Sequence, residues 1–234
     1  IHCFLPFITS FNALFITLHA YGVIFYGCYL CLSEKNANKL LILIFYIVGS
    51  ELLWRSFQAK IFWESGKIFS IFFLLVVFLR MKKEKLEGKT GILFICLLLP
   101  SIIVLDEFSL SNISHSISGP FLIGTSILVF SHVRINQDLF LKMLYWMLLP
   151  IISFFIISNY HTILSGSFNY YSAYINRIET AGIGPNQASN ILGLGSLLSF
   201  FIAILLRNNY GSIFKIIGIL TIIQTILTHS RGGF

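Results

Sequence analysis

The chain has 234 residues, of which 56% are hydrophobic and only 11% are charged, and its mean hydropathy is +0.86. This is too little charge to cover the surface of a soluble globular domain, so the composition excludes that class and predicts a polytopic membrane protein. The net charge of +7 does not indicate a nucleic-acid partner, because the densest basic stretch, RMKKEKLEGK at 80–89, is one short connection between two apolar runs. The alternating pattern of a transmembrane β-barrel is absent.

Eight apolar runs follow one another along the chain, most of them close to the length of a membrane-crossing helix. They lie at 11–32, 40–54, 66–80, 91–106, 117–133, 140–158, 187–206 and 213–229. The sequence therefore predicts an all-α fold, a polytopic bundle of about eight transmembrane helices that forms a single transmembrane domain over 1–234. Because the chain starts at Ile1 and ends directly after its last apolar run, we expect this domain to be truncated at both ends.

The basic residues are distributed unevenly between alternate connections. Eleven of the sixteen are on one side: Lys35, Lys39, Arg80, Lys82, Lys83, Lys85, Lys89, Arg134, Lys142, Arg207 and Lys215. The other five are on the opposite side: Arg55, Lys60, Lys67, Arg177 and Arg231. The positive-inside rule makes the first side cytoplasmic and the second side the outer one.

The apolar runs contain few groups that could do chemistry within the membrane. None carries Asp, Glu, Lys or Arg near its middle, and Glu51 lies near the outer end of the second run. This argues against an ion-driven transporter and moves polar chemistry to the membrane surfaces. Cys28 and Cys31 form a C-x-x-C inside an apolar run, with no second pair or nearby histidine, so no metal site is expected.

Two of the outer connections are expected to interact with the membrane surface or with solvent only. The segment 54–67 carries Trp54 and Trp63 where an aromatic belt would lie. Its basic residues are expected to meet lipid headgroups: Arg55, Lys60 and Lys67. The acidic, serine-rich segment 106–119 is expected to be a plain solvated loop.

The third outer connection, 159–186, has features of a binding site. It is longer than the ~12–15 residues beyond which structureless connections are usually functional. It contains Arg177 and ends in GIGPN, where Pro185 at the first helical position or Asn186 as a cap is suited to open a helix. Because that helix starts on the outer side, its N–H groups and positive dipole end form a candidate anion site.

Arg231 is expected to reach the same face, because the last two apolar runs form an antiparallel pair. Two arginines and a helix start would then converge at the outer boundary, where guanidinium forks suit a pyrophosphate headgroup. Simpler interpretations remain open: Arg231 followed by two glycines is also a helix C-cap, and Arg177 beside Glu179 also fits a solvated loop charge. His161 and His229 are interpreted as interfacial, and the small residues of 189–199 as helix-packing positions.

The C-terminal residues resemble a known family. NRIETAGIGPNQASNILGLGSLLSFFIAIL, then a short basic turn, then IIGILTIIQTILTHSRGGF is similar to the O-antigen ligase and O-antigen polymerase superfamily. In that family an outer loop carries an arginine and a Gly/Pro-Asn helix start, and the second of two following helices ends in Ser-Arg-Gly. The resemblance covers about residues 176–234; the remainder fits only in being hydrophobic and helical.

The resemblance implies a multi-pass enzyme of the bacterial inner membrane with its active site facing the periplasm. It implies transfer of a glycan from an undecaprenyl-pyrophosphate-linked donor to a saccharide or lipid A-core acceptor, without a metal or other cofactor. By the same resemblance Arg177 and Arg231 are the catalytic residues, which hold the pyrophosphate and stabilise the leaving group. The matching positions that would bind substrate are Gly184, Pro185, Asn186 and Ser230.

Three points stay open. Ligases of the family use a histidine in a later outer loop, whereas this sequence ends at Phe234, so no general base is assigned. A polysaccharide or lipid carrier of flippase type is the alternative, and would require charged or broken helices around a cavity in the membrane. A noncatalytic membrane scaffold is a third possibility.

Overall fold

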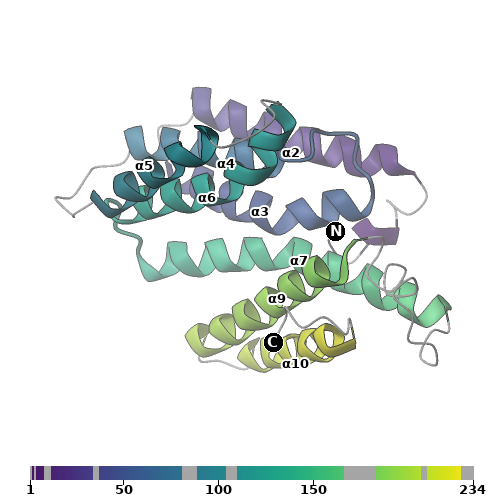
Figure 1. Ribbon diagram of the computed structural model, residues 1–234. Helices are drawn as coiled ribbons and strands as arrows, with labels where there is room; N and C mark the ends of the chain where they lie inside the picture. The colour runs from purple at the N-terminus through teal and green to yellow at the C-terminus, as the bar shows by residue number, and fades with distance from the viewer. Residues whose placement is uncertain are drawn as a thin grey trace.

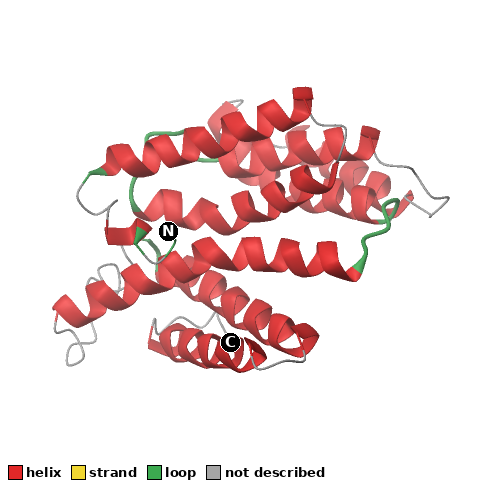
Figure 2. Ribbon diagram, turned by 180° about the vertical axis from the view of Figure 1, so that it is seen from behind, coloured by secondary structure: helices red, strands yellow, loops and turns green. Residues whose placement is uncertain are grey.

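A computed structural model describes residues 2, 4–7, 12–33, 37–80, 89–103, 110–165, 183–206 and 210–227. Over these residues the protein is helical and contains no strand (Figures 1 and 2). The helices are α2 (Ala13–Ser33), α3 (Ala37–Ser56), α4 (Ser65–Arg80), α5 (Lys89–Ile103), α6 (Leu110–Phe130), α7 (Gln137–Ser165), α9 (Pro185–Leu206) and α10 (Tyr210–Leu227). The all-α prediction is confirmed, and each predicted apolar run overlaps a helix over its described residues.

Five of these helices are long and apolar enough to cross a membrane: α2, α3, α7, α9 and α10. The helices α4 and α5 have 16 and 15 residues. At 1.5 Å per residue the described parts of these two helices span up to about 24 Å, which is less than the ~30 Å hydrocarbon layer. Among the residues of α6 whose side chains the structure describes, Ile117–Phe130 form a shorter apolar helix. The chain thus has the composition of a membrane protein with five clear candidate spans, and the count of about eight stays a prediction.

Two predicted connections are shorter than the sequence indicated. Because α6 begins at Leu110, residues 110–119 are helical, and the expectation of a solvated loop there is wrong. Likewise α7 continues to Ser165, so the first residues of the predicted connection 159–186 belong to a helix. The sequence pattern missed both extensions because their polar side chains interrupt the apolar pattern without interrupting the helix.

Successive helices run up and down, and α3 lies near the centre of the bundle. It packs against α2, α4 and α7, while α6 packs against α4 and α5. On the other side of α7 lie α9 and α10, which form a closely packed antiparallel hairpin (Figure 1). One buried apolar cluster joins α2, α3, α4 and α7, and a second one lies between α7 and α9.

The crossing of α3 and α7 depends on a glycine. A Cβ atom on Gly49 would lie 2.3 Å from the carbonyl oxygen of Met147 and 3.0 Å from the ring of Pro150. A larger residue would therefore push the two helix backbones apart. This close approach fixes the position of α3 relative to α7.

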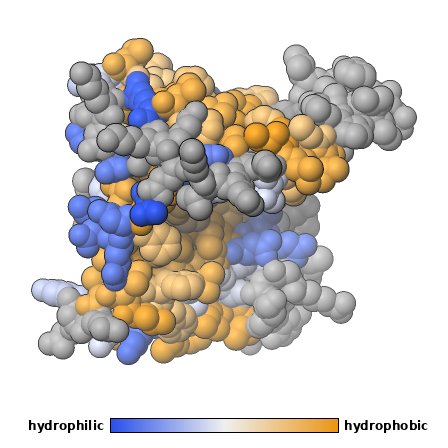
Figure 3. All heavy atoms as spheres, turned by 90° about the vertical axis from the view of Figure 1, so that its left-hand side faces the viewer, coloured by the Kyte–Doolittle hydropathy of each residue, from blue (hydrophilic) through white to orange (hydrophobic). Residues whose placement is uncertain are grey.

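The two ends of the bundle differ in charge. One end carries Lys39, Arg80, Arg134, Lys142 and Lys215; Figure 3 views this end, where hydrophilic side chains interrupt the apolar surface. The other end, called the outer end below, carries Glu51, Arg55, Lys60, Glu64 and Lys67. Between the ends, large apolar side chains such as Phe25, Leu97 and Ile204 face outward. So many exposed apolar side chains suit contact with lipid rather than water.

Candidate functional site

The start of α9 has the geometry that the sequence predicted. Pro185 is the first helical residue, and the carbonyl oxygen of Gly184 accepts hydrogen bonds from the N–H groups of Gln187 (2.9 Å) and Ala188 (3.1 Å). Of the two open alternatives, the structure therefore has proline at the first position rather than Asn186 as the cap. Because Pro185 has no N–H and that of Gln187 is engaged, an anion here would interact chiefly with the helix dipole.

The remaining predicted site residues, Arg177, Ser230 and Arg231, lie outside the described residues. The described part of α10 ends at Leu227, on the outer end where α9 begins. The helix register is visible at two glycines. A Cβ on Gly211 would lie 2.9 Å from the carbonyl oxygen of Ala203, and one on Gly195 would lie 4.0 Å from Thr221. The last described turn of α10 therefore lies beside the first turns of α9.

Small and polar residues line the seam where α9, α10 and α7 meet. Gly195 packs against Ile151, since a Cβ there would lie 2.7 Å from that side chain. Ser189 and Ser199 are fully buried, as expected for helix-packing positions. Gln224, only 2% exposed, donates a hydrogen bond of 3.0 Å from Nε2 to the Ser158 hydroxyl on α7. This bond ties the outer part of the hairpin to the rest of the bundle.

A second polar group lies at the outer end and is called the α3–α4 cluster. It consists of Glu51 and Arg55 at the end of α3, Glu64 and Lys67 around the start of α4, and Ser118 of α6. Arg55 forms an ion pair with Glu51 and lies 3.6 Å from a carboxylate oxygen of Glu64. Lys67 pairs with Glu64 at 2.6 Å, and the Ser118 hydroxyl donates to the same carboxylate at 2.8 Å. Two acids thus neutralise two bases.

Glu64 is the centre of this cluster, and its side chain is only 2% exposed. Burial by itself raises its pKa, but the hydrogen bonds from Lys67 and Ser118 and the charges of Lys67 and Arg55 outweigh burial. The pKa of Glu64 is therefore lowered from its ordinary value, and the carboxylate is ionised at neutral pH. A buried charge of this kind is stable only because its partners surround it.

The structure distinguishes the residues that were expected at the membrane surface within 54–67. Arg55 and Lys67 pair with carboxylates of the protein, whereas Lys60 is exposed. Contact of these three bases with lipid headgroups stays a prediction. Trp54 is 1% exposed and packs in the core, whereas Trp63 is 50% exposed. Only Trp63 therefore fits an aromatic belt. Acidic residues three or four positions from the bases were the available signal for internal pairing.

A chain of hydrogen bonds inside the bundle was not anticipated. The indole N–H of Trp54 donates to Nδ1 of His19 at 3.1 Å, so a neutral His19 carries its proton on Nε2 and donates to the Tyr46 oxygen at 2.7 Å. The Tyr46 hydroxyl in turn lies 3.3 Å from Nε2 of His2, whose Nδ1 lies 3.1 Å from the Ser153 hydroxyl. His19, a polar residue within an apolar run, was the overlooked signal.

The His19–Tyr46 pair borders an apolar groove of about 620 Å³. The groove follows one face of α2 and the facing side of α3, and its lining residues are His19, Gly22, Val23, Tyr26, Lys39, Ile42, Leu43, Tyr46 and Trp146. On both helices the spacing is three or four residues, so each helix contributes one continuous face. Lys39 lies at its far end, toward the more basic end of the bundle.

The start of α9 and the α3–α4 cluster lie at the same end of the molecule. Ile183, two residues before the start of α9, belongs to the same buried apolar cluster as Leu53 and Trp54 near the end of α3. The outer end therefore combines a helix start, a neutralised charge cluster and an exposed tryptophan on one packed framework. No known family model matches this chain, and no characterised protein or solved structure shows significant similarity to it.

Proposed function

We propose that this protein transfers a glycan from an undecaprenyl-pyrophosphate-linked donor to a saccharide or lipid A-core acceptor, as a ligase or a polymerase. The work would take place on the outer face of the bacterial inner membrane. The reaction class comes from the resemblance of residues 176–234. The observation that supports it is the α9–α10 hairpin, in which α9 starts at Pro185 on the end where α10 finishes.

The proposed chemistry is a displacement at the anomeric carbon of the donor sugar. An acceptor hydroxyl forms the new C–O bond, and the bond from that carbon to the pyrophosphate oxygen breaks with its electron pair. The hydroxyl proton passes to a base that we assign to no described residue. Undecaprenyl pyrophosphate leaves with the additional negative charge, so the protein's main task is to stabilise that charge.

Arg177, Arg231 and the start of α9 would share this task. A helix start contributes about half a positive charge, and each arginine can bind two phosphate oxygens through its planar fork. Residues 183–188 contain no acidic side chain that would oppose an anion. A Cβ added to Gly184 would have no described atom within 4 Å, which leaves space for a phosphate close to the backbone.

The test is replacement of each arginine in the full-length protein within its host. Arg177→Ala and Arg231→Ala should abolish surface polysaccharide and cause lipid-linked glycan to accumulate, at unchanged protein level. Arg177→Lys and Arg231→Lys should also be damaging, because an ammonium lacks the fork geometry. Arg134→Ala, at the opposite end of the bundle, is the matched control. Normal polysaccharide in both alanine variants would refute the proposal.

One observation favours the alternative, a carrier of polysaccharide or lipid. His19 and Tyr46 place titratable side chains inside the bundle beside the groove between α2 and α3, which is a feature of membrane carriers. The hydrogen-bond chain, however, starts at an indole N–H, and Ser153 donates back to the His2 carbonyl oxygen at 2.8 Å. It is therefore suited to orienting side chains. Translocation of a lipid-linked glycan by proteoliposomes, without formation of a glycosidic bond, would establish the carrier.

A further inference from the structure

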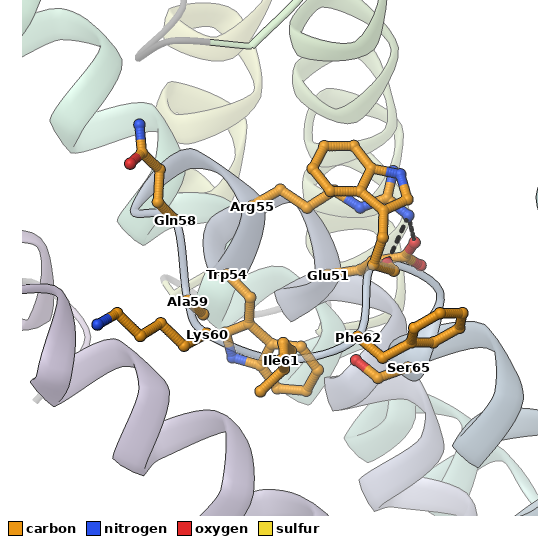
Figure 4. A pocket seen from close by; sticks show the side chains of 10 residues that line it. Glu51, Trp54, Arg55, Gln58, Ala59, Lys60, Ile61, Phe62 and Ser65 are labelled. Carbon is orange, nitrogen blue, oxygen red and sulfur yellow. Dashed lines mark hydrogen bonds and ion pairs between the residues drawn. The ribbon is translucent and has the colours of Figure 1, made fainter. Parts of the chain in front are cut away.

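A pocket of about 280 Å³ lies at the outer end, between the last turn of α3 and the connection to α4 (Figure 4). Six of its lining residues bear on what it could bind: Glu51, Arg55, Gln58, Lys60, Phe62 and Trp63. Its volume is slightly below the ~300 Å³ at which pockets for drug-sized ligands begin. The ligand it can enclose is therefore about the size of one small ring.

The pocket has an aromatic surface that the protein does not bury. Phe62 is 55% exposed and Trp63 is 50% exposed. The guanidinium carbon of Arg55 lies 4.4 Å from the centre of the Trp63 ring, and Nη2 of Arg55 also donates to the Trp63 carbonyl oxygen at 3.2 Å. Trp63 is thus held in place before any ligand arrives, which lowers the entropy cost of binding.

The polar groups of the pocket favour a ligand that donates hydrogen bonds. Nη2 of Arg55 is engaged with Glu51 and with the Trp63 carbonyl, and its Nε is buried beyond the reach of a ligand in the pocket. The Glu51 carboxylate lines the same pocket and can only accept. A phosphate would lie against this carboxylate, whereas a hydroxyl group can donate to it.

Gln58 marks the rim of the pocket. Its backbone has φ of 53°, in the left-handed region that residues other than glycine rarely adopt. The turn is fixed by hydrogen bonds from the Gln58 N–H to the Arg55 carbonyl (3.0 Å) and from the Ala59 N–H to the Trp54 carbonyl (2.9 Å). The side-chain amide of Gln58 adds one more group that both donates and accepts.

We propose that this pocket is a binding site for a single sugar ring of a glycan. Ring C–H groups would contact Trp63 and Phe62, and the hydroxyls would donate to Glu51 and bond with the side-chain amide of Gln58. The inference deepens the proposed function, on which it rests for the origin of the sugar, since it places a glycan unit at the same end of the bundle as the start of α9. Lys60, exposed at the rim, suits a sugar that carries a carboxylate.

The experiment is saturation-transfer NMR on the detergent-solubilised full-length protein with a panel of methyl glycosides, including a uronic acid. Binding in the millimolar range is expected for at least one of them. Trp63→Ala and Gln58→Ala should each weaken it about tenfold, while Trp63→Phe, which keeps an aromatic ring, should weaken it less. Trp146→Ala, a tryptophan of similar exposure outside this pocket, is the matched control. Gln58→Ala tests the same pocket without altering Trp63, so weaker binding in both variants cannot be explained by misfolding of the Trp63 variant alone.

Three results would overturn the inference. One is the absence of a signal from every glycoside. Another is equal binding by wild type and Trp63→Ala. The third is tighter binding of phosphatidylglycerol vesicles than of any sugar, with loss of that binding in Trp63→Ala, which would identify a lipid headgroup site. Sugar binding should persist in Arg177→Ala, so a failed pocket and a failed transferase remain distinguishable. Sugar binding combined with normal polysaccharide in the arginine variants supports the pocket and refutes only the transferase.

Discussion

The two polar regions at the outer end of the bundle handle charge in opposite ways. In the α3–α4 cluster, Glu51 and Glu64 neutralise Arg55 and Lys67 within the protein. At the start of α9, residues 183–188 supply a positive dipole end with no acidic side chain. Charges that neutralise one another mainly stabilise the fold, whereas a helix start without a counter-charge in its own segment is disposed to bind an anion. Mutations of Glu64, which lies outside the proposed sugar pocket, should therefore change stability, and those at the start of α9 should change activity.

The largest effect on stability is expected from Glu64→Leu. This variant leaves Lys67 and Arg55 near a buried apolar site without their shared partner, at a cost of about 3 kcal/mol in the free energy of unfolding. Guanidinium unfolding of the detergent-solubilised protein measures the loss. Glu64→Gln should lose less, because its amide oxygen still accepts from Ser118. If Glu64→Leu were as stable as the wild type, the charges of the α3–α4 cluster would not stabilise the fold, and the proposed difference between the two regions would be refuted.

A smaller effect is expected from Ser158→Ala in the seam below the start of α9. Gln224 would keep its amide buried without the acceptor it now uses, which should cost about 1 kcal/mol. Thermal unfolding in nanodiscs measures this change. The control is Ser199→Ala, because among the described residues the Ser199 hydroxyl bonds only to a carbonyl of its own helix, that of Gly195, at 2.7 Å. Equal losses in both variants would mean that the Gln224–Ser158 bond does not hold the hairpin in place.

Acid should weaken the α3–α4 cluster. The pKa of Glu64 is lower in the folded protein than its ordinary 4.5, so its contribution to stability is fully present above that value and is lost as pH falls through the folded pKa. Melting temperatures measured from about pH 7 to about pH 3 should show a constant difference between wild type and Glu64→Gln above pH 4.5, and a shrinking one below it. A difference in melting temperature that grows as the pH falls would mean that the pKa of Glu64 is raised in the folded protein rather than lowered.

The smallest effect on stability is expected from Gly184→Ala. An added Cβ would meet no described atom within 4 Å, and the glycine is not in the left-handed region, so unfolding should be unchanged within about 0.5 kcal/mol. If a pyrophosphate approaches the backbone here, polysaccharide formation should nevertheless fall. Pairing the variant with Gly22→Ala, which also has open space around it, controls for a general effect of alanine. Full activity of Gly184→Ala would contradict close approach of the donor.

Much of the fold was predictable because a membrane imposes one rule. Backbone groups in hydrocarbon must bond within their own segment, so each long apolar run becomes a helix. The helix starting at Pro185 was likewise predictable, because the preference of proline for the first helical position is local and does not depend on tertiary contacts. Polar stretches were harder: residues 110–119 continue a helix although their composition is typical of a loop. One of these residues, Ser118, donates a hydrogen bond to Glu64, which lies 54 positions earlier in the chain.

The sequence alone determined the helical class, the positions of the apolar segments, the difference in charge between the two ends and the resemblance that suggests a lipid-linked glycan. All of these depend on local composition or on the order of residues along one segment. Only the tertiary structure decided which charges neutralise one another, that Trp54 is buried while Trp63 is exposed, and that His19, Tyr46 and Trp54 share one hydrogen-bond chain. Such pairings depend on the register between helices distant in sequence, which packing at sites such as Gly49 sets and which no single segment encodes.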